Sequence, residues 1–536
     1  MLKPLSQAIN QFNIYSLIRF LIRPFLFSFV ILILFSRVVS INISHDEYQF
    51  VASTQVFISQ GQIPYLDYPF LHMPYQIVVN SIAVLFSDYH LFAIRSLNAF
   101  FFLVSILIVF FLVTHIYNSH SFILKYLAGT LSVMLFLFDP TLLGMDGRAL
   151  NHAFPVLLSL LAYVTFQYWA SNKQSVIPLL GCGFLIGLAT GVRLSFAVLV
   201  IPFVIMLAFC PGLQPVTDLF KRISTFLVGL CLSLLPVGLL LINAPNEFFF
   251  GNYVYIKLNT IYRQEVLFQH SMTPVAKIQY FIANVLAHPG PIILYFGLLF
   301  SALYLFAKLI RRDSQNNGML SLSVLTSLVL VGSGFAPTPL WPQYFFAPVP
   351  FLVIGLFTWI ATIQKTNIKR LLFIGISAAA IIGFPFQLTG NQIDVLRNRS
   401  QWIPVQTHAL AQQIHKTVNQ GKVATLAPIY PLEAGLETYP SFIVGPFVWR
   451  TAPLLSAEGR ANYQVTSFHE LEGLLDADPP SAIITGLETD YGFDAYSFGL
   501  LEKPLIDYAV ANGYEPYQKL KPDFWPTTIT VWVKQP

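Results

Sequence analysis

Long apolar stretches recur through the first three quarters of the chain, separated by short polar or basic segments. About 20 apolar residues in a helix span the hydrocarbon core of a bilayer. The pattern predicts eleven membrane-spanning helices, at 22–41, 96–116, 126–143, 151–170, 177–192, 194–210, 223–243, 291–308, 318–335, 345–363 and 370–388. The segment 74–87 is apolar but short, so we expect it to lie along the membrane surface. The basic N-terminus predicts an interfacial helix before an uncleaved first span.

After residue 388 the pattern changes to short alternating elements. Helical periodicity and strand-like alternation follow one another at 405–419, 422–427, 467–475, 481–485, 502–512 and 527–533, and the last resembles an edge strand. The sequence therefore predicts an α-helical polytopic membrane domain over residues 1–388 and a small α/β domain over residues 389–536.

Composition and charge support a membrane protein with two regions in different solvents. Hydrophobic residues make up 55% of the chain and charged residues 10%, whereas soluble proteins carry about 25% charged residues. Basic residues follow every second predicted span, at Lys125, Lys173, Lys221, Lys308 and Lys369. Basic loops stay in the cytoplasm. We therefore expect a multi-pass protein of the plasma (inner) membrane, with a cytoplasmic N-terminus and an extracytoplasmic C-terminal domain.

Acidic residues of the membrane domain gather on the predicted outer side. The long outer loops are 42–95 and 244–290, and the acids at the outer face are Asp46, Glu47, Asp67, Asp88, Asp139, Asp146, Glu247 and Glu265. The region 389–536 contains no phosphate loop, nucleophile elbow or metal motif. This one-sided distribution favours polar chemistry at the outer membrane face.

The first outer loop begins with the acidic pair Asp46-Glu47, and the segment 61–69 follows with Gly-Gln-Ile-Pro-Tyr-Leu-Asp-Tyr-Pro. Carboxylates near hydrocarbon must stay hydrated, pair with a cation or shift their pKa. One interpretation is a general base held at the membrane surface. The other is that the pair caps a helix beginning at Tyr48.

An Asp-Glu pair after the first span, followed by Gly-x-x-Pro-Tyr-x-Asp, resembles the GT-C integral-membrane glycosyltransferases. The most similar branch contains protein O-mannosyltransferases, lipid A aminoarabinose transferases and lipopolysaccharide-core transferases. The resemblance covers residues 1–388 and the outward C-terminal domain. It implies inverting transfer of a sugar from a polyprenyl-phosphate donor to a lipid, glycan or protein acceptor, with no nucleic acid involved. It further implies that Asp46 is the general base and that Glu47 orients Asp46 or the acceptor.

Cations on the outer face are candidates for holding the donor phosphate. Arg193 stands between two apolar spans with no acid nearby in sequence. Bidentate binding of a phosphate would satisfy it, although arginines also extend to lipid headgroups. Arg148, Lys257 and Arg263 are further candidates, with the alternative that exposed loop cations are simply solvated.

Sugar or acceptor contacts are expected at Tyr65, Asp67, Asp146 and Tyr344. Asp146 could bind sugar hydroxyls or a cation, or it could form an ion pair with Arg148. Tyr344 could line the donor groove or belong to the interfacial aromatic belt. His45, His72 and His152 could form a metal site with Asp46 or Asp146. Their spacing is unlike a structural zinc site, so no metal ligand is assigned and a divalent cation stays an alternative.

Three other functions compete with a transferase. A transporter or flippase of lipid-linked glycans would bind its substrate near the bilayer midplane through intramembrane polar groups, whereas the predicted spans here are almost free of charge. A glycan polymerase or ligase would also act at the outer face. A non-catalytic scaffold would leave the acidic outer loop unexplained.

Overall fold

The computed structural model describes residues 14–142, 145–172, 175–209, 216–266, 272–311, 317–383, 390–488, 501–522 and 527–534. Lys173 and most of the N-terminal interfacial helix lie outside these ranges. The same holds for the last residues of the predicted spans 126–143, 194–210 and 370–388.

All eleven predicted spans coincide with apolar helices. They are α2 (Ile14–Ser40), α5 (His90–Ile116), α6 (Phe122–Leu137), α7 (Ala153–Asn172), α8 (Ile177–Val192), η1 (Leu194–Leu199) with α9 (Val200–Phe209), α10 (Val216–Asn243), α14 (Pro289–Ile310), α15 (Gly318–Gly334), α16 (Val349–Thr362) and α17 (Thr366–Gly383). Among the described residues, six of these helices are long and apolar enough to cross a membrane and the others are shorter. The chain is an integral membrane protein, and the number of spans stays a prediction.

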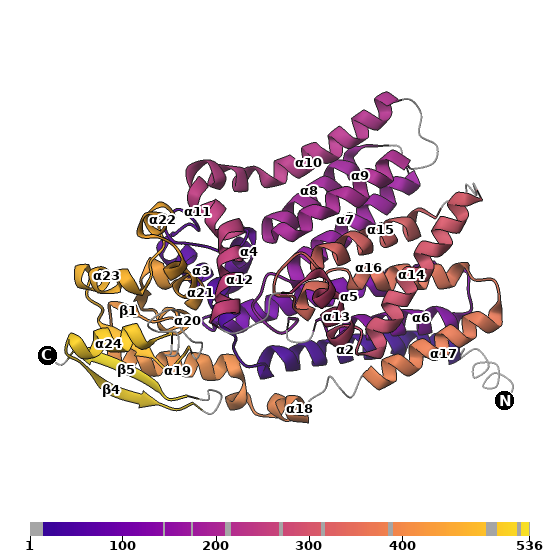
Figure 1. Cartoon of the computed structure of the whole chain (residues 1–536). Helices are drawn as coiled ribbons and strands as arrows, with labels where there is room; N and C mark the ends of the chain where they lie inside the picture. Colours follow the sequence, from indigo (N-terminus) through magenta and orange to yellow (C-terminus); the bar gives the residue numbers. More distant parts are fainter. Residues whose placement is uncertain are drawn as a thin grey trace, which may run out of the picture.

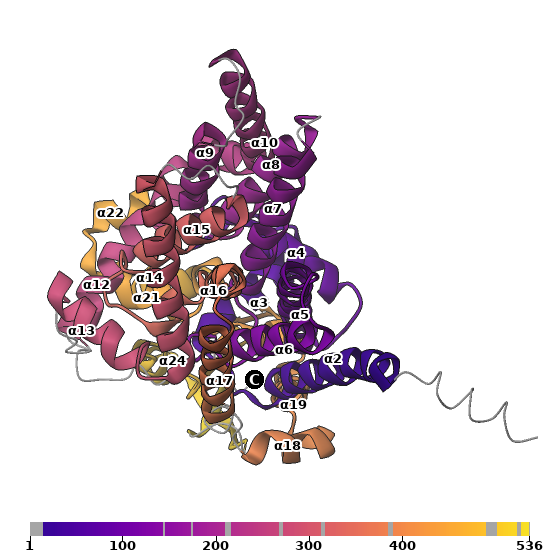
Figure 2. The same cartoon turned by 90° about the vertical axis from the view of Figure 1, so that its right-hand side faces the viewer.

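The apolar helices run side by side (Figure 1). The predicted surface segment forms α4 (Tyr75–Val84), which follows α3 (His45–Gln60). The long outer loop forms α11 (Pro245–Phe249), η2 (Phe250–Val254), α12 (Tyr255–Glu265) and α13 (Pro274–Asn284). Helices α3, α4, α11 and α12 lie at the end of the bundle that carries the C-terminal domain, opposite the N-terminus (Figure 1). Helix α16 lies between α14, α15 and α17 on one side and α5 and α7 on the other (Figure 2).

Glycines allow α8 and α10 to cross in direct backbone contact. A Cβ atom at Gly183 would overlap the carbonyl oxygen of Phe226, and one at Gly229 would overlap that of Leu180. Small residues spaced along one helix face are the usual means of close helix packing in membranes.

We therefore expect Gly183→Ala to destabilise the protein by about 1–3 kcal/mol, because overpacking a tight contact forces the backbones apart. Thermal unfolding in detergent measures the effect. Gly238→Ala on α10 is the matched control, since nothing lies within 4 Å of an added Cβ there. Equal unfolding temperatures for the two variants would contradict this account of the packing.

The C-terminal domain contains a five-stranded sheet of order β2-β1-β3-β5-β4. Its strands are β1 (Lys422–Ala424), β2 (Glu437–Thr438), β3 (Ala482–Thr485), β4 (Tyr514–Leu520) and β5 (Ile529–Lys534). Strand β1 pairs in parallel with β2 and β3, whereas β5 is antiparallel to β3 and β4. The helices α19 (Ile403–Val418), α23 (Leu471–Ala477) and α24 (Lys503–Ala511) complete the predicted alternation.

One prediction for the sheet is wrong, because 527–533 is not an edge strand. Strand β5 lies inside the sheet, and the edge is β4, which the sequence pattern missed. Strand β4 reads Tyr-Glu-Pro-Tyr-Gln-Lys-Leu and is largely exposed. Polar residues and proline are tolerated at a sheet edge, so this strand carries no alternating apolar signal.

Short elements occur in both the membrane bundle and the C-terminal domain and in the segment between them. They are η3 (Pro342–Phe345), α18 (Gly390–Arg397), η5 (Arg399–Gln401), α20 (Ile429–Glu433), η6 (Pro440–Phe442), α21 (Pro446–Thr451), η7 (Ala452–Leu454), α22 (Ala457–Asn462) and η8 (Phe468–Glu470). Phe50, Tyr65 and Leu258 from the outer loops share one hydrophobic core with Val444 and Phe447 from the C-terminal domain. The shared core holds the domain against α3 and α12.

Candidate active site

The start of α3 is determined by a capping box. The Ser44 side chain accepts a hydrogen bond from the Asp46 amide (3.3 Å), and the Glu47 carboxylate accepts one from the Ser44 amide (3.1 Å). This reciprocal pattern satisfies free amides at a helix N-terminus. The helix therefore begins at His45, and of the acidic pair it is Glu47 that completes the cap.

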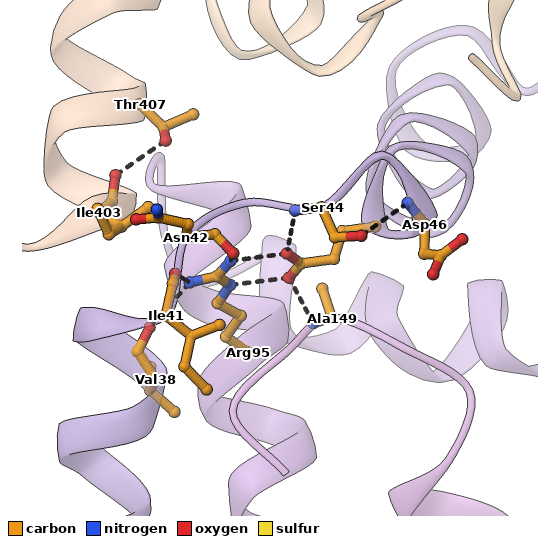
Figure 3. A network of polar contacts seen from close by, with 10 residues as sticks. Val38, Ile41, Asn42, Ser44, Asp46, Arg95, Ala149, Ile403 and Thr407 are labelled. Carbon is orange, nitrogen blue, oxygen red and sulfur yellow. Dashed lines mark hydrogen bonds and ion pairs between the residues drawn. The ribbon is translucent and has the colours of Figure 1, made fainter. Parts of the chain in front are cut away.

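Glu47 is fully buried and binds the guanidinium of Arg95 (Figure 3). Arg95 donates from Nε to Oε1 (2.8 Å) and from Nη2 to Oε2 (2.6 Å), and its Nη1 donates to the carbonyl of Ile41 (2.7 Å). The Ala149 amide donates to the same carboxylate (2.7 Å). Glu47 therefore joins α2, α3, α5 and the segment before α7. Glu47 therefore influences Asp46 only by fixing where α3 begins.

Asp46 points away from this network (Figure 3). Its side chain is 39% exposed, and its nearest charged neighbour is Nε2 of His45 at 4.0 Å. Within the described ranges no hydrogen bond is made to its carboxylate. The adjacent acids thus differ completely in environment, because neighbouring helical residues face about 100° apart.

Arg193 and Tyr344 lie near Asp46. Arg193 follows α8 and stacks over the ring of Phe346 at 5.5 Å. Burial raises the pKa of the Tyr344 phenol, the positive charge of Arg193 opposes this rise, and the charge of Asp46 adds to it. These effects require the three side chains to be close in space, although η3, α3 and the end of α8 are far apart in sequence.

Helix α12 and the C-terminal domain add two more arginines. Arg450 of α21 is buried and donates to the Asn259 Oδ1 (3.0 Å) and the Tyr255 hydroxyl (3.5 Å). Burial raises the pKa of Tyr255; the charges of Arg450 and Arg263 lower it, and that of Asp46 raises it. Tyr255 therefore lies near both arginines and Asp46.

Asp46 and the buried Glu488 thus lie in one neighbourhood with Arg193, Arg263 and Arg450 and with two tyrosines. Arg263 stacks over the ring of Trp341 at 5.3 Å, and its buried Nε has no hydrogen-bond partner among the described residues. Guanidinium groups match phosphate oxygens in geometry, and the Nε of Arg263 is available to donate to an anion. The arrangement can hold a phosphate beside a carboxylate that is free to accept a proton.

Three predicted ligand residues have structural partners instead. Asp146 is buried and forms an ion pair with Arg37, not with Arg148. Asp67 is exposed and accepts a hydrogen bond from the Ile63 amide (2.6 Å) in a tight turn. The buried hydroxyl of Tyr65 donates to the His72 carbonyl. These contacts shape the loop, and a sugar-binding role for the three side chains stays a prediction.

Lys257 and Arg148 are the other two predicted cations. Lys257 is exposed, and its Nζ lies 4.4 Å from the ring centre of Tyr253 in η2, the element directly before α12. Arg148 is half-buried and directly precedes Ala149, whose amide donates to Glu47. The Nε of Arg148 has no hydrogen-bond partner within the described residues. Arg148 thus stays a candidate, whereas Lys257 has the placement of a solvated loop cation.

Sequence reasoning missed the contribution of the C-terminal domain. Arg450 stands in the apolar run 442–454, and an arginine in such a run signals a buried cation. Glu488, which follows β3, contacts Nδ1 of His45 at 3.5 Å. Burial lowers the pKa of His45, but the bond to Glu488 and the charges of Asp46 and Glu488 outweigh this effect and raise it overall.

The described residues contain no group of three or more His, Cys, Asp or Glu side chains placed to hold a metal ion. His45 lies beside Glu488, whereas His72 and His152 lie near Arg193. The structure therefore does not bring the three histidines together as one ligand set.

Neither a protein-family model nor a curated protein sequence matches the chain. Solved structures do match. ArnT from Cupriavidus metallidurans bound to undecaprenyl phosphate is similar with a TM-score of 0.58 and 12% identity, over 95% of this chain and 97% of that chain. The chain has the fold of ArnT.

The apo state of ArnT from the same organism is similar with a TM-score of 0.55, 12% identity and coverage of 94% and 97%. The oligosaccharyltransferase of Archaeoglobus fulgidus has a TM-score of 0.49 at 11% identity, over 86% of this chain and 70% of that chain. The ArnT likeness confirms the predicted fold of apolar helices with a small C-terminal α/β domain.

Proposed function

We propose that the protein is a membrane glycosyltransferase that moves a sugar from a polyprenyl-phosphate donor to an acceptor hydroxyl at the extracytoplasmic face. The observation that carries this proposal is the Asp46 carboxylate, without a hydrogen bond in the described chain, near Arg193 and near the tyrosines that Arg263 and Arg450 also approach. The ArnT fold supports it, since the ArnT structure holds undecaprenyl phosphate.

The proposed reaction is a direct displacement. The acceptor oxygen attacks the anomeric carbon, the bond from that carbon to the phosphate oxygen breaks, and polyprenyl phosphate leaves with the bonding electrons. Asp46 takes the acceptor proton. Because one displacement occurs, the anomeric configuration inverts. The arginines stabilise the charge that develops on the leaving phosphate, so no strong acid is needed.

The experiment is a transfer assay in reconstituted liposomes. The substrate is a polyprenyl phosphate carrying a radiolabelled sugar, offered with a panel of lipid, glycan and peptide acceptors. Label in a new glycosidic bond supports the proposal. Label that crosses the bilayer without forming a new bond would indicate a transporter or flippase and would overturn it. Parallel reactions with EDTA test whether a divalent cation is required.

Two outer-face cations give a graded test of the phosphate site. We expect Arg193→Gln to weaken binding of polyprenyl phosphate by about 10–100-fold, since hydrogen bonds to charged groups contribute about 1.5–3 kcal/mol. For Lys257→Gln we expect a loss at least tenfold smaller, because its ammonium is exposed and stacked on Tyr253. Equilibrium binding to the reconstituted protein measures both. Equal losses would remove Arg193 as the principal phosphate ligand.

A further inference from the structure

Two histidines, the buried His152 and the half-buried His72, lie near Arg193 and have no part in the chemistry above. His152 directly precedes α7, and its ring lies 4.7 Å from the ring of Phe346, over which Arg193 also stacks. His72 lies between α3 and α4 and stacks on Phe50, with ring centres 5.2 Å apart. Arg193 and His152 therefore contact the same ring, that of Phe346. His72 is the third member of this group and comes from the segment between α3 and α4.

His152 is an unusual buried group because neither ring nitrogen has a hydrogen-bond partner within the part of the chain that the structure describes. Its side chain is almost fully enclosed, at 6% exposure for the residue. Buried polar atoms are nearly always paired, and an orphan costs about 1–3 kcal/mol. A nitrogen left without a partner beside a guanidinium indicates a place where a ligand atom completes the site.

The charges around the two imidazoles explain their protonation state. Burial and the charge of Arg193 lower the pKa of His72 to about 4, and the charge of Asp46 opposes the change. Burial, Arg193 and His72 all lower the pKa of His152. The other side chains against the two rings are the apolar Phe50, Phe70 and Phe346. Both histidines are thus neutral at pH 7 when the site holds no anion.

We propose that His72 and His152 form a proton-accepting part of the phosphate site, taking up a proton when a phosphate binds at Arg193. This inference rests on the proposed function, because it requires Arg193 to bind the donor phosphate. An anion at Arg193 offsets the charge that keeps the imidazoles neutral and favours their protonated form. The imidazolium then donates a hydrogen bond to a phosphate oxygen.

Proton uptake by the imidazole is separate from the transfer of the acceptor proton to Asp46. A sugar phosphodiester carries one negative charge, and cleavage of its anomeric C–O bond leaves polyprenyl phosphate with a second. The proton on the imidazole comes from solvent when the donor binds, whereas the acceptor proton goes to Asp46. The imidazolium therefore meets the new charge on the leaving group without competing for the acceptor proton.

The test uses geranyl methyl phosphate, a phosphodiester that stays singly charged from pH 5 to pH 8, so its own titration cannot contribute. The histidine pKa is lower in the free protein than in the complex, so binding must tighten as pH falls between the two values. We expect affinity for the reconstituted protein at pH 5 to exceed that at pH 7 by about tenfold or more. His72→Gln with His152→Gln should abolish this difference.

His120→Gln is the matched control. His120 also has a pKa lowered by burial and by a nearby cation, Lys369, but it lies in the connection between α5 and α6. This variant should keep the pH dependence of the wild type. If the double variant does not fold, calorimetry of wild-type binding in two buffers of different ionisation enthalpy counts the protons taken up.

An equal affinity at both pH values, an unchanged pH dependence in the double variant, or calorimetric proton uptake near zero would each overturn the inference. In those cases the proposed function still stands if the labelled sugar is transferred. If the phosphodiester fails to bind at any pH and no sugar is transferred, both the inference and the proposed function are wrong.

Discussion

Replacing Asp46 with asparagine is expected to slow sugar transfer by about 10²–10⁴-fold while polyprenyl phosphate still binds. An amide cannot accept the acceptor proton. The fold should tolerate the change, because within the described residues the Asp46 carboxylate makes no hydrogen bond and its side chain is 39% exposed. Removing one negative charge from beside the arginines should leave phosphate binding equal or tighter.

The measurements are kcat in the liposome assay and the Kd for polyprenyl phosphate. Asp507→Asn is the control, since Asp507 is also an exposed aspartate, on α24, where it pairs with Lys503. Full transfer activity in the Asp46 variant would place the base elsewhere. Loss of phosphate binding together with activity would mean that the substitution disturbs the site rather than the chemistry.

The second large effect is on stability and comes from the Glu47–Arg95 pair. We expect Arg95→Met to destabilise the protein by about 3–5 kcal/mol, because it leaves the Glu47 carboxylate buried and uncompensated. Both side chains are fully buried. The double variant with Glu47→Gln should recover part of this loss, since it removes the buried charge.

Thermal unfolding in detergent compares these variants with Lys503→Met, which breaks the half-exposed Lys503–Asp507 pair and should cost at most about 1 kcal/mol. A similarly small change for Arg95→Met would show that Glu47 does not organise the outer loop. In the intact protein, the pair keeps α3 in register with α5, so its loss should also reduce transfer by displacing Asp46.

The local pattern of apolar and polar residues was sufficient to predict much of the fold. Each run of apolar residues long enough to cross a bilayer became a helix, because a chain in hydrocarbon must satisfy its backbone hydrogen bonds internally. The Ser44–Glu47 spacing likewise determines where α3 begins. Strand β4 was missed because a polar edge strand lacks an apolar alternation.

The candidate site was only partly predictable. Asp46 was singled out as the base by its position after the first span and by family resemblance, and this role stays a proposal. Asp146 was expected to bind a ligand or pair with Arg148, yet its partner is Arg37, more than a hundred residues earlier. No spacing rule connects two residues that distant.

The sequence by itself determined the membrane character, the helices, the α/β domain and the concentration of acids in a few loops, because these depend on local composition and periodicity. Only the tertiary structure decided which carboxylates are neutralised by an ion pair and which stay available to accept a proton. Glu47 and Asp146 are held by Arg95 and Arg37, whereas Asp46 makes no hydrogen bond through its carboxylate within the described residues and lies near Arg193 from a distant segment. Charge pairing acts through space between side chains, and that proximity exists only after the helices and the C-terminal domain have packed.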